Sequence, residues 1–228
     1  MPRGGVFLNK KSFTLSEVLI TLSIIGIIAA ITIPVIIANY QEKSRISKIR
    51  KTYSTLANAM TYVKINNGDL IFEEDIKDSQ ETVNSWFNEY LKPYIATTKI
   101  CYDEEGCWAQ EQVKYLNGSY NLNSRKGIGI GTKIVTAVLN DGTFIEVNST
   151  QYTFCDVFKV NCKTNKGIAI YFDINGDKGP NTIGKDIFIA VFTDNGLKPA
   201  YSEALDEVET ECSSKGRGYS CLIKYLGL

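Results

Sequence analysis

Histidine is absent from this chain of 228 residues. The sequence therefore lacks the commonest general base and the commonest metal ligand of proteins. Catalysis would need carboxylate or Ser/Lys chemistry, and no motif for either is present. We predict that the protein is not an enzyme, and a membrane-anchored enzyme is the least favoured alternative.

Charged side chains are absent between Val18 and Ile37. A helix rises about 1.5 Å per residue, so this run of about 20 residues spans roughly 30 Å, the thickness of a bilayer core. We predict a membrane-spanning helix over about residues 15–37. Glu17 stands at the edge of the run, where a carboxylate is costly and usually has a partner. The alternative is that Glu17 reaches the membrane surface and pairs with nothing.

A secretory cleavage site is also missing. Such a site follows the apolar region and has a pattern of small residues. Here Ala29 and Ala30 lie inside the apolar run, and Pro34 follows them. An uncleaved signal anchor would fit these facts, so the segment before the run becomes decisive.

That segment is a short polar leader with three basic residues, followed by a small residue and an aromatic one: Arg3, Lys10, Lys11, Ser12 and Phe13. Together with Glu17 and Pro34, this order resembles the class III signal of type IV prepilins and type II secretion pseudopilins. The resemblance is strong over about residues 10–60. It implies that a prepilin peptidase cuts between Ser12 and Phe13, releases leader peptide 1–12 and methylates the amino group of Phe13. The residue before the cut is most often Gly in the family, and Ser12 is also small.

The resemblance also implies a role for Glu17, which becomes the fifth residue of the mature chain. When subunits pack through their helices, Glu17 can pair with the α-amino group of Phe13 on a neighbour, which compensates both charges in a low-dielectric bundle. Pro34 removes a backbone hydrogen bond and invites a kink.

The function implied is that of a structural subunit of a type IV pilus or a type II secretion pseudopilus. Its partners would be the prepilin peptidase, like subunits in a helical filament, an assembly ATPase, inner-membrane platform proteins and the membrane itself. The chain would cross the bacterial cytoplasmic membrane once, with an extracytoplasmic head, before it enters the filament. The alternative is a minor or tip pilin that acts as an adhesion or DNA-binding module. Residues 1–52 have net charge +6 and the remainder −6, which disfavours DNA binding by the head.

Six cysteines all follow the apolar run, and none forms a C-x-x-C motif, so a zinc site is not expected. Their spacing suggests three disulfides, although fifteen connectivities are formally possible. Disulfides indicate an oxidising compartment, and the alternative is six buried thiols in a reducing one. The suggested pairs are Cys101–Cys107, Cys155–Cys162 and Cys212–Cys221.

The fold expected is α+β, with one long helix packed on a small antiparallel sheet. The helix should cover residues 13–67, apolar all round in its first half and amphipathic in its second, and end at Asn66-Asn67-Gly68. Residues 68–228 should form the globular head, with a second helix from Ser79 to Pro93. Runs of mainly apolar residues next to turn residues predict the strands at residues 134–139, 143–147, 168–173 and 186–192.

The segment between the last two predicted strands has the residues of a cation-binding loop. Asp173, Asn175 and Asp177 alternate like the first ligands of a calcium loop, and Asp186 follows. The segment is similar to a loop in the heads of many prepilin-like proteins and loosely to the calcium loops of major pseudopilins. Lys178 and Gly184 depart from the EF-hand pattern, so the alternative is a metal-free turn whose side chains cap its own amides. The glycine-rich run 127–131 lacks the Lys-Ser/Thr ending of a phosphate loop, which argues against nucleotide binding.

Overall fold

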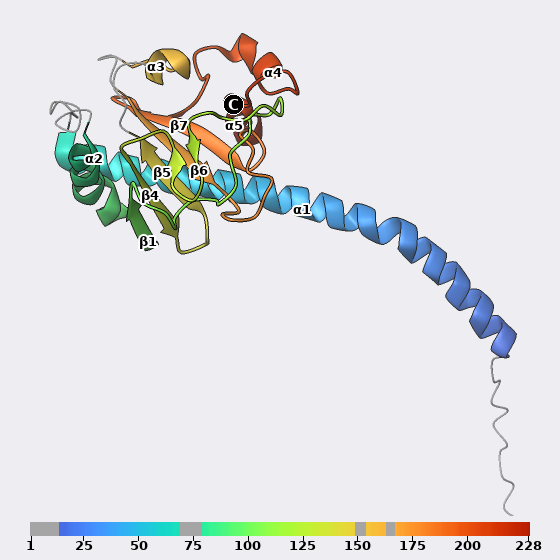
Figure 1. The fold of residues 1–228 in the computed structure, drawn as a ribbon. Coiled ribbons are helices and arrows are strands. Elements are labelled where there is room, and N and C mark those ends of the chain that lie inside the picture. The colour runs from blue at the N-terminus through green and yellow to red at the C-terminus, as the bar shows by residue number, and fades with distance from the viewer. Residues whose placement is uncertain (1–13, 69–78, 149–153, 163–166) are drawn as a thin grey trace, which may run out of the picture. The chain divides into compact units, whose positions relative to one another are not determined.

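The computed structural model describes residues 14–68, 79–148, 154–162 and 167–228. Ser12 and Phe13, the predicted processing site, lie outside these residues. The chain divides into two compact units, Met1–Arg45 and Ile46–Leu228, and helix α1 (Leu15–Asn67) contributes to both (Figure 1).

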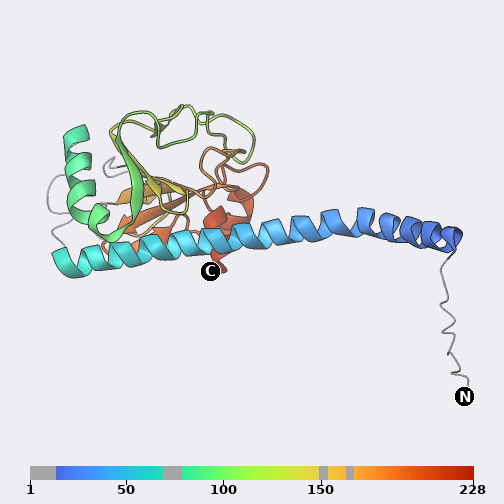
Figure 2. The same ribbon diagram turned by 90° about the horizontal axis from the view of Figure 1, so that it is seen from below.

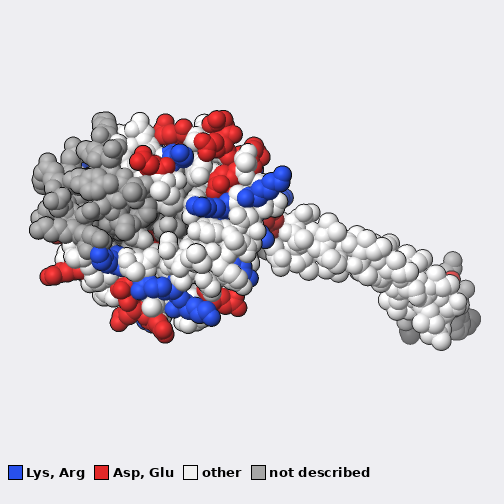
Figure 3. Space-filling model, turned by 45° about the horizontal axis from the view of Figure 1, so that its top comes forward, with Lys and Arg blue, Asp and Glu red and all other residues white. Residues whose placement is uncertain are grey.

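In the first unit, the apolar part of α1 has almost no buried side chain. Within the described residues, α1 is the one helix that is long and apolar enough to cross a membrane. Figure 3 shows its first half as a white surface, because no charged residue lies between Val18 and Ile37. The helix continues through Pro34 and is curved in this half (Figure 1).

In the second unit, α1 is amphipathic, as predicted. Its buried residues recur at helical spacing and face a hydrophobic core: Ile49, Leu56, Ala59, Met60 and Val63. The helix ends at Asn67, and Gly68 follows with a φ of +60°. Glycine adopts this left-handed conformation at little cost, so the predicted end of the helix is confirmed.

The head contains a six-stranded antiparallel sheet with the order β1-β4-β5-β6-β7-β8. Neighbouring strands in the order β4 to β8 are also neighbours in sequence, and β1 adds to the free edge of β4. Gly142, with a φ of +78°, closes the predicted hairpin between β4 and β5. The strands are β1 (Thr97–Tyr102), β4 (Ile134–Leu139), β5 (Phe144–Asn148), β6 (Ile168–Asp173), β7 (Ile187–Thr193) and β8 (Gly196–Pro199). The α+β class is therefore confirmed.

Both faces of the sheet are buried. One face packs on α1, on α2 (Gln80–Trp86) and on the π-helical and 3-10 turns that follow it, Phe87–Leu91 and Lys92–Tyr94 (Figure 2). A second core covers the other face, built from the loop between β1 and β4 and from C-terminal segments. The short elements there are β2 (Ser124–Arg125), β3 (Gly129–Ile130), α3 (Phe154–Val157), a 3-10 turn (Leu205–Glu207) and α4 (Val208–Glu211). Helix α5 (Cys221–Leu226) contributes side chains to both cores.

The edge strands β1 and β8 were not predicted. The second helix begins where expected, because the Ser79 side chain accepts a hydrogen bond from the backbone N of Thr82. Its later part is π-helical and 3-10 rather than α-helical. The last predicted strand is shifted by one residue and ends at Thr193.

Candidate functional site

Thr14 and Glu17 form a reciprocal pair at the start of α1. The Glu17 Oε2 atom accepts hydrogen bonds from the Thr14 backbone N at 2.9 Å and from Thr14 Oγ1 at 2.8 Å. The backbone N of Glu17 in turn donates to Thr14 Oγ1 at 3.3 Å. This arrangement is a capping box, which satisfies amide groups that a helix start otherwise leaves without a partner. The T-x-x-E spacing is visible in the sequence, but the family resemblance points to a partner of Glu17 on another subunit and gives no sign of the pair with Thr14.

This capping box lies at the start of the apolar helix α1. The sequence around it is the part of the chain that matches a known family. Residues 8–33 match the family model described as the prokaryotic N-terminal methylation motif. The chain carries a type IV prepilin-like signal. No curated protein and no solved structure matches the chain.

The prepilin-like signal has general consequences. It implies processing by a prepilin peptidase and assembly into a filament, and it belongs to structural pilin-type proteins rather than to an enzyme family. A long apolar helix near the N-terminus is consistent with a membrane-anchored pilin. The match ends at residue 33, so the sites in the head must be described from their own geometry.

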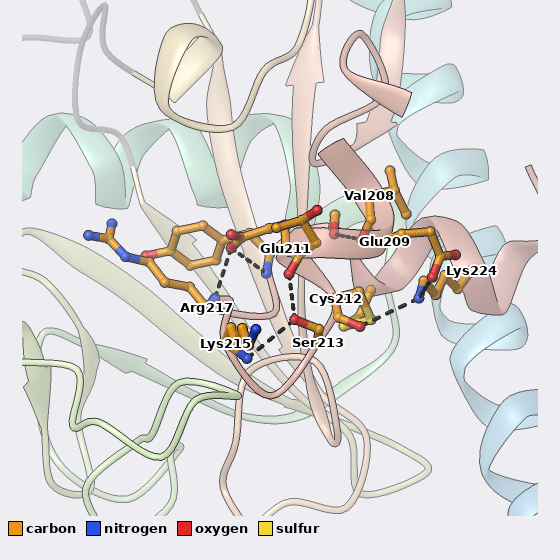
Figure 4. Close-up of a disulfide and its surroundings, with 12 residues drawn as sticks. Val208, Glu209, Glu211, Cys212, Ser213, Lys215, Arg217 and Lys224 are labelled. Atoms are coloured by element: carbon orange, nitrogen blue, oxygen red, sulfur yellow. Dashed lines mark hydrogen bonds and ion pairs between the residues drawn. A yellow bond between two sulfur atoms is a disulfide. The ribbon is translucent and has the colours of Figure 1, made fainter. Parts of the chain in front are cut away.

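The head of this prepilin-like protein contains three disulfides. All six cysteines lie in the described residues, and each is paired with its close neighbour in sequence, as the spacing suggested. The bond Cys101–Cys107 lies at the start of the loop that covers the second sheet face. Cys155–Cys162 joins α3 to the segment that follows it. Cys212–Cys221 joins the ends of α4 and α5 (Figure 4).

Hydrogen bonds reinforce the C-terminal disulfide loop. Glu211 Oε1 accepts from the backbone N of Arg217 at 3.1 Å and of Tyr219 at 3.4 Å (Figure 4). Lys224 on α5 donates to Glu209 on α4 at 2.7 Å. The disulfide and these contacts cross-link residues 212–221 to α4 and α5.

The predicted cation loop joins β6 to β7 and uses two buried carboxylates. Asp173 Oδ1 accepts from the backbone N of Asn175 at 3.0 Å and of Gly176 at 3.1 Å. Asp186 accepts from the backbone N of Asn181 at 2.8 Å and of Thr182 at 2.6 Å. These contacts are those of the alternative we considered, a turn that caps its own amides.

The turn leaves several buried oxygen atoms without a protein partner in the described residues. They are Asp173 Oδ2, Asn175 Oδ1 and the amide oxygen of Asn181. Burial raises the pKa of Asp173 to about 8, and the nearby Asp186 adds to this rise against the hydrogen bonds from Asn175 and Gly176. Burial also raises the pKa of Asp186. Two close carboxylates that are costly to ionise would gain from a cation.

The members of the predicted ligand set differ in their surroundings. Asp173 and Asp186 are buried and Asn175 is partly buried, whereas Asp177 is exposed. No group of three or more His, Cys, Asp or Glu side chains that could hold a metal occurs in the described ranges. Amide oxygens would therefore have to complete a cation site. Asn181, 1% exposed, was missed because its residue type alone gives no signal.

Proposed function

We propose that the protein is a structural subunit of a type IV pilus or a type II secretion pseudopilus. In this proposal the chain is cut between Ser12 and Phe13, is methylated on Phe13 and assembles through α1. The observation that carries the proposal is the methylation motif at residues 8–33, which leads into a helix that is apolar on all sides. Such a helix needs lipid or other helices around it.

Assembly would give Glu17 a new partner. In the single subunit its carboxylate accepts hydrogen bonds from Thr14. A carboxylate inside a helix bundle also needs charge compensation, which the α-amino group of Phe13 on a neighbour would supply. The capping box is consistent with this change of partner because it places Glu17 in the first turn of α1, four positions after Phe13 in the sequence.

The test is the intact mass and N-terminal sequence of the protein taken from its native membrane. We expect a mature chain that starts at N-methylated Phe13. A chain that retains residues 1–12 in cells with an active prepilin peptidase would contradict the proposal and leave an anchored head without a filament role.

The proposed location is the cytoplasmic membrane with the head outside, followed by the filament. Three disulfides support an oxidising compartment for the head. An assembly ATPase and inner-membrane platform proteins would be the assembly partners. The alternative role is that of a minor or tip pilin that acts as an adhesion or DNA-binding module. Counting the copies in each filament distinguishes it from a major subunit, because a tip pilin would be present in a few copies at the filament end.

We also propose that the loop between β6 and β7 binds Ca²⁺. Asp173, Asn175 and Asp186 are the first ligands, Asn181 adds an amide oxygen, and Asp177 stays a candidate from the sequence pattern. The support is the set of buried oxygen atoms without a protein partner, since calcium prefers several oxygen ligands.

The calcium proposal can be tested on the full-length protein in detergent by adding CaCl₂ or EDTA. At about 100 times the dissociation constant, Ca²⁺ should stabilise the head by roughly 2.7 kcal/mol, which raises the melting temperature by roughly 5–10 °C. Asp173→Asn should abolish this shift, and Asp206→Asn, an exposed control in the Leu205–Glu207 turn, should retain it. An unchanged melting temperature of the wild type would contradict the proposal.

A further inference from the structure

The glycine-rich run 127–131 is held against the middle of the sheet by two side chains of β5. Ile130, in β3, donates its backbone N–H to Glu146 Oε2 at 2.7 Å. Its carbonyl oxygen accepts a hydrogen bond from Asn148 Nδ2 at 3.0 Å. Glu146 and Asn148 are two residues apart and share one sheet face. Side chains of β5 thus bind both polar backbone groups of Ile130, while β3 also pairs with β2 within the same loop.

The glycines allow this close approach. A Cβ atom added to Gly129 would lie 2.6 Å from Glu146 Oε2, and one added to Gly131 would lie 2.8 Å from Asn148 Nδ2. The φ angles of these glycines are +145° and +99°. The run that superficially resembled a phosphate loop is therefore the segment that fits onto Glu146.

Glu146 is fully buried, and its second oxygen, Oε1, has no hydrogen-bond partner in the described part of the chain. Across the sheet it lies opposite Thr136 on β4 and Tyr171 on β6. The Thr136 hydroxyl also lacks a partner among the described residues. The nearby cation, Arg125 on β2, is engaged in an ion pair with Asp103. Glu146 therefore has no ion-pair partner among the described residues, and Arg125 compensates its charge only in part.

These surroundings favour the neutral acid. Burial raises the pKa of Glu146 well above its usual value, the hydrogen bond from Ile130 and the charge of Arg125 oppose this rise, and Asp103 adds to it. Burial keeps the pKa of Tyr171 well above its usual value, so this neighbour stays neutral. A neutral carboxyl still accepts the hydrogen bond from Ile130, and it carries no charge that the buried site would have to compensate. The Ile130 amide, the Arg125 charge and the Asn148 side chain together do not offset the cost of ionising this buried carboxyl.

We propose that Glu146 is an acid-operated latch, whose neutral form holds residues 127–131 on the sheet and whose ionisation, with the proton passing to solvent, releases them. The released segment belongs to the loop of residues 103–131, which carries the exposed side chains of Tyr120 and Leu122. The latch would thus couple external pH to the position of these two side chains. The latch does not depend on filament assembly. If the latch proposal is wrong, the proposal of a pilus or pseudopilus subunit is unaffected.

The test is hydrogen exchange of the Ile130 amide in the full-length protein in detergent, corrected for the intrinsic pH dependence of exchange. As the pH rises above the ordinary carboxyl pKa of 4.5, we expect protection of the wild-type amide to fall by up to about tenfold per pH unit, because the open state ionises more readily than the closed one. Glu146→Gln, which cannot ionise, should keep constant protection. Glu104→Gln, an exposed change on the same loop, should behave as the wild type.

Two results would overturn the proposal: protection in the wild type that does not depend on pH, or a pH dependence that persists in Glu146→Gln. If Glu146→Gln does not fold, carbon-13 NMR of the wild type replaces it. The Glu146 carboxyl and the Ile130 amide signals should then titrate with one common midpoint. A titrating carboxyl beside an unchanged Ile130 amide would show that ionisation does not open the segment.

Discussion

At the scale of single residues, Gly129 shows how little space separates β3 from the sheet. An added Cβ would clash with Ile134 Cδ1 and lie 2.6 Å from Glu146 Oε2, at a φ of +145°. We expect Gly129→Ala to lower the free energy of unfolding by about 2–4 kcal/mol, from backbone strain and overpacking together. Urea unfolding of the head measures this loss.

Gly118→Ala is the matched control, because its φ is +85° and no atom lies within 4 Å of the added Cβ. It should cost only about 1 kcal/mol, the strain of a left-handed alanine. Equal losses at the two positions would mean that the close approach at Gly129 contributes nothing to stability.

A second prediction at this scale concerns Glu146 and the way in which the free energy of unfolding depends on pH. Burial raises its pKa in the folded protein well above 4.5, so the folded state holds the proton more tightly than the unfolded chain. The stabilisation is complete below the unfolded pKa and is lost as the pH rises through the folded pKa. We expect the unfolding free energy of the wild type to fall relative to Glu146→Gln above about pH 5. Parallel curves for the two proteins would contradict this expectation.

The role of Glu146 could not be predicted from the strand sequence. The alternation in Phe144-Ile145-Glu146-Val147 would by itself place Glu146 on a solvent face. Residues 127–131 cover Glu146 in the folded head. In the sequence, β4 lies between this segment and Glu146, so only the folded chain brings them together. Asp173 and Asp186 could be recognised because their spacing resembles a known loop.

At the scale of elements, the disulfide Cys212–Cys221 joins α4 to α5. Removing it with Cys212→Ser and Cys221→Ser should destabilise the head by about 2–3 kcal/mol, because a short loop becomes free in the unfolded chain. Thermal unfolding of the double variant measures this effect. Ser214→Ala, in the same loop and exposed, is the control and should change little. An unchanged melting temperature of the double variant would refute the expectation.

The elements that the sequence predicted are those with a complete local signal. Helix α1 ends at a glycine cap, Ser79 caps the start of α2, and the four predicted strands are runs of mainly apolar residues. The missed strands are both at sheet edges. In β1 most residues are exposed or half-buried, and β8 has four residues that end in Pro199. Their strand conformation depends on pairing with β4 and β7, which a local pattern cannot reveal.

At the scale of the whole molecule, we expect that a substitution can block filament assembly without affecting the folding of the subunit. Glu17 contacts only Thr14 among the described residues, so Glu17→Ala should leave the head and the membrane helix intact. Filament yield should fall at least about tenfold, because the α-amino group of a neighbour would be left buried without its partner. Counts of filaments by electron microscopy, with the amount of processed subunit as reference, measure this effect.

Glu42→Ala is the control for Glu17→Ala. Glu42 is also exposed on α1, and its partner Arg45 lies on the same helix. Filament yield should stay near that of the wild type. An equal loss in both variants would indicate a general effect of charge on α1 rather than a role of Glu17 in assembly.

The continuity of α1 also determines how the subunit would respond to tension. The helix contains no cysteine, so all three covalent cross-links lie elsewhere in the head. A pull on the N-terminal end would travel along the helix to Ile49, Leu56, Met60 and Val63, whose contacts with the sheet would be loaded together in shear. The force that a subunit withstands would then be set by this apolar packing and its unfolding rate, and reducing the disulfides would weaken the head without detaching it from its anchor.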